Sequence, residues 1–335
     1  MIVVFTGGTG GTKLVQGLQH VVAPEELTVI VNTGDDLEWW GLHVSPDIDS
    51  VLYGLGGLLS KERGWGIDGD SFQCLDRMKQ LGQPAWFSLG DLDLATHLIR
   101  TSLLSSGSTL TQATAELASH LEIRARVLPM SDNRVSTMLD TEKGVLTFQE
   151  YFVRERHQVA VTAVRFDGAE LAHPAPGVID SIEHADAIIF APSNPVTSVG
   201  PILAVPGIRE ALRRTSAPIV AVSPIVGGTA VSGPAAQLMQ MQGWPSTIHG
   251  VVQAYEDFLD LLVIDTADRE TLGLPHRTPD KLPFRAVADP LWIDPGPQPR
   301  VRFLATEIIM RSAEDKRNLA AFVLNACATP QSAGA

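Results

Sequence analysis

Cysteine, aromatic residues and positive charge are all scarce in this chain of 335 residues. The two cysteines, Cys74 and Cys327, are too few and too far apart for a disulfide framework or a zinc cluster, which favours a reducing, cytoplasmic setting. The chain has 25 Lys and Arg against 38 Asp and Glu, a net charge of −13. Because no run of basic residues stands out, we expect no binding to nucleic acid through counterion release.

Long apolar segments are missing as well. No uncharged apolar run reaches the roughly 18 residues that a membrane helix needs, and the first residues lack the basic segment of a signal peptide. We therefore expect no membrane partner. The chain also contains no G-x-S-x-G elbow, no H-E-x-x-H pair and no compelling Cys/His arrangement, so a nucleophilic serine or cysteine is not indicated.

What the sequence does have is a glycine-rich loop at its start. An apolar strand at 2–5 runs into this loop, and Lys13 and a helical pattern to about residue 22 follow. Glycine lets a ligand approach the backbone, and a helix that begins there points free N–H groups at an anion. We therefore predict a phosphate-binding loop, formed by Gly7, Gly8, Thr9, Gly10, Gly11 and Thr12.

The loop matches neither G-x-G-x-x-G nor the P-loop, so a tight turn that needs glycine only for its geometry is the alternative interpretation. The missing G-x-G-x-x-G also counts against an NAD-dependent oxidoreductase. Because neither motif is present, the glycine loop alone does not identify the kind of nucleotide that would bind.

The alternation of short branched strands with helical patterns predicts an α/β fold. Buried parallel strands are indicated at 2–5, 27–32, 187–191, 219–223 and 261–265. Helical patterns cover 13–22, 50–60, 71–81, 93–105, 109–121, 253–260 and 312–327, further strands are indicated at 124–128 and 145–153, and 266–300 is expected to be irregular.

We therefore predict a Rossmann-like, mostly parallel open sheet with helices on both faces and a largely helical insertion. In this prediction residues 1–45 and 175–330 form a nucleotide-binding core, and residues 46–174 form a cap that binds substrate.

Small, polar or glycine-rich loops follow four of the strand patterns. Ligands of open α/β sheets bind beyond the carboxyl ends of the strands. Each loop alone is ordinary turn chemistry, but four at one edge predict a cleft for a nucleotide diphosphate. The further nucleotide-binding residues in this prediction are Ser193, Asn194, Gly227 and Gly228.

Asp47 and Asp49 lie two residues apart just ahead of a predicted helix. Either could simply cap that helix. They could also gather with Asp35, Asp36, Asp91 and Asp93, and clustered carboxylates repel one another unless a cation such as Mg²⁺ joins them. Both interpretations stay open, and the metal-binding candidates are Asp49 and Asp36.

Aromatic residues concentrate in the first 90 residues of the chain. They could stack on a flat ring ligand, although packing within a core is the default for any one of them. The nine histidines show no ligand spacing and are interpreted as structural, with His97 near the Asp91 and Asp93 segment. The aromatic residues concerned are Trp39, Trp40, Trp65, Trp86 and Phe87.

These motifs, in this order, resemble the 2-phospho-L-lactate transferase family, which builds the deazaflavin coenzyme F-420. The resemblance spans roughly residues 1–265 and the last helix, and it rests on the series as a whole because each motif is short. The matching stretches are 7–14, 31–36, 45–53, 65–67, 89–97, 128–132, 192–195, 223–228 and 232–235. Where the family usually has Gly-Asp-Arg-Asp, this chain has Leu92 in place of the arginine.

The resemblance implies a phosphoryl transfer. The terminal ribityl hydroxyl of 7,8-didemethyl-8-hydroxy-5-deazariboflavin (Fo) would attack the β-phosphorus of a guanosine diphosphate ester, and GMP would leave. The acid on that ester would be 2-phospho-L-lactate or phosphoenolpyruvate, with 3-phosphoglycerate a further variant. Asp49 would be catalytic, engaging the hydroxyl or Mg²⁺, and Asp49 and Ser88 would lie at the Fo site.

The same resemblance implies an upstream guanylyltransferase that supplies the donor, and a homodimer. If the arginine replaced by Leu92 meets an anion in relatives, the acid accepted here would differ; if it packs outward, nothing follows. The alternative function is a non-catalytic regulator that binds nucleotide sugars, as in the related gluconeogenesis factors. The paired aspartates and the aromatic-rich insertion favour the enzyme.

Overall fold

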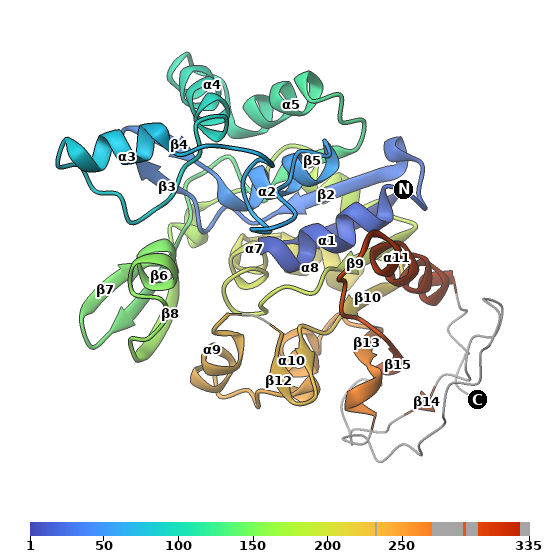
Figure 1. Cartoon of the computed structure of the whole chain (residues 1–335). Coiled ribbons are helices and arrows are strands. Elements are labelled where there is room, and N and C mark those ends of the chain that lie inside the picture. The colour runs from blue at the N-terminus through green and yellow to red at the C-terminus, as the bar shows by residue number, and fades with distance from the viewer. Residues whose placement is uncertain (232, 270–290, 293–300, 329–335) are drawn as a thin grey trace.

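A twisted eight-stranded sheet forms the centre of the computed structural model, which describes residues 1–231, 233–269, 291–292 and 301–328 (Figure 1). Seven strands run parallel, and the outermost, β14 (Leu291–Trp292), pairs antiparallel with β15 (Arg302–Thr306). The other strands are β1 (Ile2–Thr6), β2 (Leu27–Val31), β5 (Arg126–Pro129), β9 (Ala187–Phe190), β10 (Ile219–Val222) and β13 (Leu261–Asp265).

The order of the strands fixes where a ligand can bind. The sheet runs β14-β15-β13-β10-β9-β1-β2-β5, so the chain builds outward from β1 in one direction and from β9 in the other. β1 and β9 are hydrogen-bonded neighbours, and the helices that follow them pack on opposite faces of the sheet. This is the topological switch point of a doubly wound sheet, beyond whose carboxyl edge such folds bind nucleotides.

Two apolar cores cover the two faces of the sheet, as the two-residue period of a strand requires. Val3 and Phe5 point into one core, and Val4 between them points into the other. The first core is covered by α6 (Val178–Glu183), α7 (Gly200–Ala204), α8 (Ile208–Arg214), α9 (Ala235–Met241) and α10 (Ile248–Tyr255). The second is covered by α1 (Gly8–Leu18), α2 (Pro46–Leu55), α5 (Leu110–His120) and α11 (Ala313–Ala328).

Smaller elements surround one end of the sheet. A hairpin of β3 (Leu37–Trp39) and β4 (Leu42–Val44) lies near α3 (Gln73–Gln80) and α4 (Asp93–Ser105), and a three-stranded antiparallel sheet lies below them (Figure 1). That sheet contains β6 (Ser136–Thr141), β7 (Gly144–Thr147) and β8 (Val161–Asp167). The remaining elements are β11 (Ile225–Val226), β12 (Thr229–Ala230) and the short helical turns Pro24–Glu26, Glu150–Arg154, Ala169–Leu171 and Thr266–Asp268.

The predicted fold class is confirmed: the sheet is mostly parallel and both faces carry helices. The division into a core and a cap at 46–174 stays a prediction. Within that segment, β5 is the strand next to β2 in the main sheet, and α2 and α5 pack on the sheet's core. The segment therefore completes the sheet as well as covering it.

Several local predictions were wrong. The helix expected at 50–60 is α2, which begins at Pro46 and carries Asp47 and Asp49 in its first turn. The strand expected at 145–153 ends at Thr147 and is followed by a helical turn, because the Glu150 carboxylate accepts a hydrogen bond from the Thr147 amide. The helix expected at 253–260 is α10, which spans Ile248–Tyr255 and therefore begins and ends five residues earlier. The sequence analysis did not predict the strands β6, β8 and β15.

Side chains cap two of these helices. Asp91 accepts hydrogen bonds from the amides of Gln73 and Cys74 and so caps the start of α3. Thr109 caps α5 in a capping box with Gln112. The irregular stretch expected at 266–300 lies mostly outside the described residues, as does the tail after Ala328.

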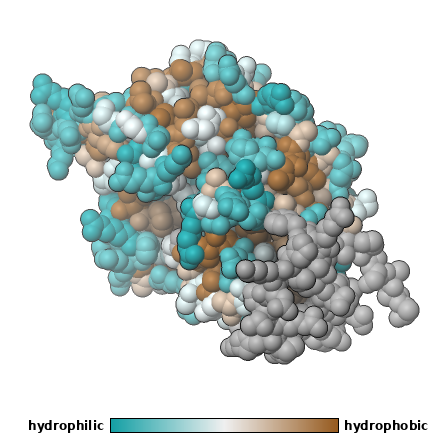
Figure 2. Space-filling view, turned by 45° about the vertical axis from the view of Figure 1, so that its right-hand side comes forward, coloured by the Kyte–Doolittle hydropathy of each residue, from teal (hydrophilic) through white to brown (hydrophobic). Residues whose placement is uncertain are grey.

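The surface is mixed in character on the face shown in Figure 2, where hydrophobic and hydrophilic residues alternate. The projection at the upper left is hydrophilic, in agreement with α3, none of whose residues is buried. No helix of the described residues is both long and apolar enough to cross a membrane.

The crossing of α1 and α11 yields a test of the packing. A Cβ added at Gly17 would lie 2.1 Å from the carbonyl oxygen of Lys316, which is backbone and cannot move aside. We predict that Gly17→Ala lowers the free energy of unfolding by about 1–3 kcal/mol through overpacking, despite the better helix propensity of alanine. Chemical denaturation measures the change, with the exposed helical substitution Ser119→Ala as control. An unchanged midpoint for Gly17→Ala would contradict the close crossing.

Candidate active site

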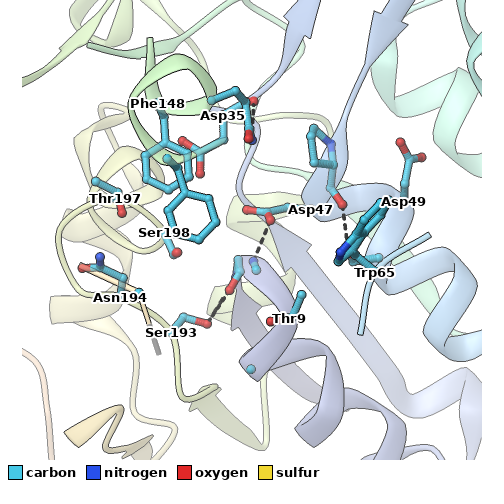
Figure 3. A pocket seen from close by; sticks show the side chains of 18 of the residues that line it. Thr9, Asp35, Asp47, Asp49, Trp65, Phe148, Ser193, Asn194, Thr197 and Ser198 are labelled. Carbon is cyan, nitrogen blue, oxygen red and sulfur yellow. Dashed lines mark hydrogen bonds between the residues drawn. The ribbon is translucent and has the colours of Figure 1, made fainter. Parts of the chain in front are cut away.

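A cavity of about 550 Å³ opens at the switch point, between the loops that follow β1 and β9. Figure 3 shows Asp47 between Asp35 and the glycine loop, with Ser193, Asn194 and Phe148 on one side and Asp49 on the other. Lys13 is the one lysine or arginine among the described residues that line the cavity. The cavity therefore joins a helix N-terminus, an acidic wall and an apolar region.

The glycine loop forms one end of the cavity. α1 begins directly after Gly7, and the first amides of a helix have no partner inside it, so those of Thr9 and Gly10 can receive an anion. The Gly7 amide donates to Ser193 Oγ at 3.3 Å, which ties this loop to the loop after β9. A Cβ at Gly10 would lie 2.7 Å from the Pro192 carbonyl oxygen, so only glycine permits this approach.

The structure brings together most of the predicted nucleotide-binding residues. Those that line the cavity are Gly7, Gly8, Thr9, Gly10, Ser193 and Asn194. Gly11 and Thr12 instead lie buried within α1, where Gly11 packs against Thr6 and Ser193. Their contribution is to place the helix, not to touch a ligand in the cavity.

Gly227 and Gly228 do not line the cavity with the other described residues. Their amides donate to the two carboxylate oxygens of Asp268, at 3.1 and 3.0 Å. The predicted anion cradle thus exists, but an internal carboxylate occupies it. A role for these two glycines in binding nucleotide stays a prediction without support from this geometry.

An acidic wall faces the glycine loop. Asp47 Oδ1 accepts a hydrogen bond of 2.7 Å from the Gly8 amide, and its Oδ2 accepts one of 3.0 Å from Asn32 Nδ2. Asn32 Nδ2 also donates to Asp35 Oδ2 at 3.0 Å. Asn32, at the end of β2, therefore holds two buried carboxylates together beside the helix N-terminus.

Burial makes this cluster costly when it is ionised. Burial and the nearby charge of Asp47 raise the pKa of Asp35 well above its ordinary value. Burial likewise raises the pKa of Asp47 to about 6, against the hydrogen bonds from Asn32 and Gly8 that lower it. The pKa of Asp36 is also raised by burial, although His43 and Ser45 offset part of the effect. Such perturbed carboxylates in a cleft are typical of functional sites.

Asp49 has a separate partner. The guanidinium of Arg100, on α4, engages both carboxylate oxygens of Asp49, and Arg100 is completely buried. Burial alone would lower the pKa of Arg100, but the charge and hydrogen bonds of Asp49 raise it. His97 lies between, with Nδ1 3.6 Å from Asp49 Oδ2 and Nε2 3.3 Å from Asp93 Oδ1.

The residues present suit a hard cation such as Mg²⁺. Among the described residues, no three His, Cys, Asp or Glu side chains converge as a complete metal site. Mg²⁺ commonly takes one or two carboxylates and completes its shell with water and phosphate oxygens. Asp35 and Asp47 line the cavity, and Asp35 Oδ1 is buried without a hydrogen-bond partner.

The predicted metal candidates are less suited to that role. Asp49 is already engaged by Arg100, and Asp36 does not line the cavity but accepts a hydrogen bond from Ser45. The expected gathering of aspartates is found for Asp35, Asp36, Asp47, Asp49 and Asp93 but not for Asp91, which caps α3.

The apolar part of the cavity comes from two regions. Trp65, Phe87 and Ser88 line it from the segment between α2 and α4. That Ser88 contacts Fo stays a prediction. Phe148 and Phe152 line it from the helical turn that follows β7, with ring centroids 5.4 Å apart. Trp39, Trp40 and Trp86 instead pack in one apolar cluster, which joins the β3–β4 hairpin to the segment that ends at Phe87.

Several lining residues were not predicted from the sequence. Ile308, Ile309 and Met310 follow β15 and reach the cavity from the far end of the chain. No local pattern marks them. His97 and the buried Arg100 behind the cavity could have been linked to Asp93, because spacings of four and three residues place the three side chains on one face of a helix.

Leu92 lies away from this chemistry. Its side chain is 55% exposed, it does not line the cavity, and its amide donates to Asp70. The structure therefore supports the outward-packing alternative for this departure from the family pattern.

Comparisons with known proteins show the family of the chain and agree with its fold. The family model described as 2-phospho-L-lactate transferase CofD matches residues 2–281. The chain is 43% identical over 268 residues to a 2-phospho-L-lactate transferase of Methanosarcina mazei, covering 80% of this chain and 88% of the relative. It is 45% identical over 273 residues to a phosphoenolpyruvate transferase of Streptomyces griseus, covering 80% of this chain and 86% of that one.

A crystal structure of a UPF0052-family protein from Bacillus halodurans is similar in fold. It superimposes with a TM-score of 0.53 over 79% of each chain at 20% identity, a likeness that shows the fold alone. The family match and the close relatives decide more: the protein is an enzyme, and the chain belongs to the 2-phospho-L-lactate transferase family.

Proposed function

We propose that the protein transfers 2-phospho-L-lactate or phosphoenolpyruvate from its guanosine diphosphate ester to the ribityl hydroxyl of Fo, releasing GMP. An upstream guanylyltransferase would supply the ester. The proposal rests on one observation above the others: a helix N-terminus and a wall of buried carboxylates face each other across a single cavity at the switch point. Relatives at 43–45% identity are named for the transfer of these two acids.

The donor would lie along the glycine loop. Its diphosphate would accept hydrogen bonds from the free amides at the start of α1, where the helix dipole favours negative charge. Lys13, which lines the same cavity, would add the positive charge that this acidic chain otherwise lacks there. Ser193 and Asn194, from the loop after β9, would complete the nucleotide side.

The acceptor would lie against the apolar part of the cavity. The rings of Trp65, Phe148 and Phe152 offer flat surfaces for a deazaflavin, and Ser88 lies in the same wall. The ribityl chain would then reach the Asp49 carboxylate, which accepts the proton or hydrogen bond of the attacking hydroxyl. A new bond forms between that oxygen and the β-phosphorus, and the bond from the β-phosphorus to the bridging oxygen breaks, so GMP leaves.

Asp35 and Asp47 would hold Mg²⁺ together with the donor phosphates. The ion, when bound, neutralises charge on the diphosphate and so assists departure of GMP. It would also relieve the repulsion between two carboxylates that burial makes costly to ionise.

Incubation with substrates tests the function directly. We predict that the protein, Fo, Mg²⁺ and a guanosine diphosphate ester of 2-phospho-L-lactate or phosphoenolpyruvate yield a phosphodiester of Fo and one equivalent of GMP. Mass spectrometry of the products, with the two esters in competition, identifies the acid. Binding of nucleotide sugars without any turnover would instead support a regulatory protein.

Asp49→Asn tests the proposed acceptor of the hydroxyl proton. The amide keeps the size of the side chain but cannot take a proton, so we expect kcat to fall by about 10²–10⁴-fold. Steady-state rates measure the loss, and circular dichroism checks that the fold is intact. A rate within a few-fold of the wild type would remove Asp49 from the chemistry.

Asp35→Asn tests the cost of the acidic cluster in protein freed of metal by a chelator. A folded-state pKa above the unfolded value of about 4 means that ionisation of Asp35 destabilises the fold, fully so above the folded pKa. We therefore predict that Asp35→Asn raises the melting temperature, and more at pH 8 than at pH 5. The exposed Asp68→Asn is the control. A gain that is equal at both pH values would contradict a raised pKa.

A further inference from the structure

Arg100 is the largest completely buried side chain among the residues that the structure describes, and it is not one of those that line the cavity. It comes from α4, whereas the carboxylate that it engages comes from α2. Burying a guanidinium costs free energy unless it is paired with an anion. Here the ion pair is bidentate: Nη1 donates to Asp49 Oδ2 at 3.2 Å, and Nη2 donates to Oδ1.

We propose that Arg100 is the positioning residue of the transferase: it fixes the Asp49 carboxylate so that its remaining acceptor positions face the attacking hydroxyl of the acceptor substrate. This inference rests on the proposed function and adds to it the residue that orients the proton acceptor. Arg100 itself touches no substrate and acts only through Asp49.

The geometry of the pair leaves Asp49 little freedom. A carboxylate offers about four acceptor positions, and the guanidinium fork takes one on each oxygen. The plane of the carboxylate is therefore set by the plane of the guanidinium. Asp49 still lines the cavity, so the positions left over are the ones that a substrate hydroxyl can use.

Neighbouring side chains hold Arg100 in turn. Its Nη1 lies 3.3 Å from His97 Nδ1, and because a guanidinium can only donate, a hydrogen bond between the two is accepted by His97 Nδ1. His97 Nε2 lies 3.3 Å from Asp93 Oδ1, and the same oxygen accepts a hydrogen bond from the Tyr53 hydroxyl. The chain of contacts runs from Asp49 on α2 to α4 and back to Tyr53 on α2, so it closes on itself.

A purely structural bridge between α2 and α4 is the competing explanation. It predicts lower stability on substitution, with activity lost only as the fold is lost. Positioning predicts instead that the folded variant turns over slowly, and that the defect vanishes once Asp49 can no longer act as a proton acceptor. These outcomes separate the two roles.

The experiment is a double-mutant cycle on the full-length protein with Fo and the guanosine diphosphate ester. Arg100→Lys keeps the charge that a buried carboxylate needs but loses the planar fork. We expect its kcat to fall by about 10²-fold, with the KM of the donor within about twofold of the wild type. In the Asp49→Asn background we expect Arg100→Lys to change the residual rate by less than about twofold. The exposed Arg124→Lys is the matched control.

Binding of Fo alone, followed by its fluorescence, gives a readout that needs no donor. We expect Arg100→Lys to weaken Fo binding in the wild-type background but not in the Asp49→Asn background. If Arg100→Lys has the rate and the Fo affinity of the wild type, the positioning role is overturned while the proposed function stands. Equal losses of rate and affinity in the wild-type and Asp49→Asn backgrounds would overturn it as well. If the wild-type protein neither binds Fo nor turns over, the proposed function fails, and the inference fails with it. The double variant Asp49→Asn/Arg100→Met removes both charges of the buried pair. We expect its melting temperature to stay close to that of the wild type while its rate stays as low as that of Asp49→Asn, so that the loss of rate is not due to unfolding.

Discussion

The two hydrogen bonds accepted by Asp47 hold three separate segments of the chain in one place. One comes from the Gly8 amide at the start of α1, the other from Asn32 at the end of β2, and Asp47 itself belongs to the first turn of α2. Asn32 is buried and the bond from Gly8 is partly buried, so the amide of Asn32 in particular cannot exchange its partner for water at low cost. The glycine loop, the switch point and the acidic wall keep their relative positions because this carboxylate joins them.

Like-charged carboxylates crowded out of water destabilise a folded chain, and this protein keeps several of them beside its cavity. One of the neighbouring acids, Asp49, has an internal cation in Arg100, whereas Asp35 has no ion-pair partner among the described residues and relies on neutral hydrogen-bond donors such as Asn32. The contrast divides the wall into a neutralised part and an unneutralised part. Under the proposed function the first part meets the acceptor hydroxyl, and the second meets Mg²⁺ and the donor phosphates.

The sequence predicted the centre of the fold well because its strands are buried on both faces. Runs such as those of β9 and β13 are short, branched and continuous, and few other structures accept them. β6 and β8 escaped prediction because they form a small, half-exposed sheet whose alternation is broken by polar residues. The segment after β7 was taken for a strand because local propensity cannot show the carboxylate of Glu150 beginning a helical turn.

The site was predicted to the extent that it depends on strand ends. β1 and β9 are neighbouring parallel strands, so the residues directly after them lie side by side at the switch point. Ser193 is hydrogen-bonded there to the backbone of Gly7. The pairing of Arg100 with Asp49 joins residues 51 positions apart through the packing of two helices, and no local pattern encodes it. Asp268, which fills the cradle of Gly227 and Gly228, was missed for the same reason.

The contribution of Ile308, Ile309 and Met310 to the cavity has a consequence for biosynthesis. These residues follow the seventh parallel strand, β15, which pairs with β13, and the helix after them packs across α1 near the start of the chain. The wall of the cavity therefore forms only after β15 has been synthesised and has paired with β13. Because contacts between residues far apart in the sequence form slowly, we expect the cavity to close late in folding.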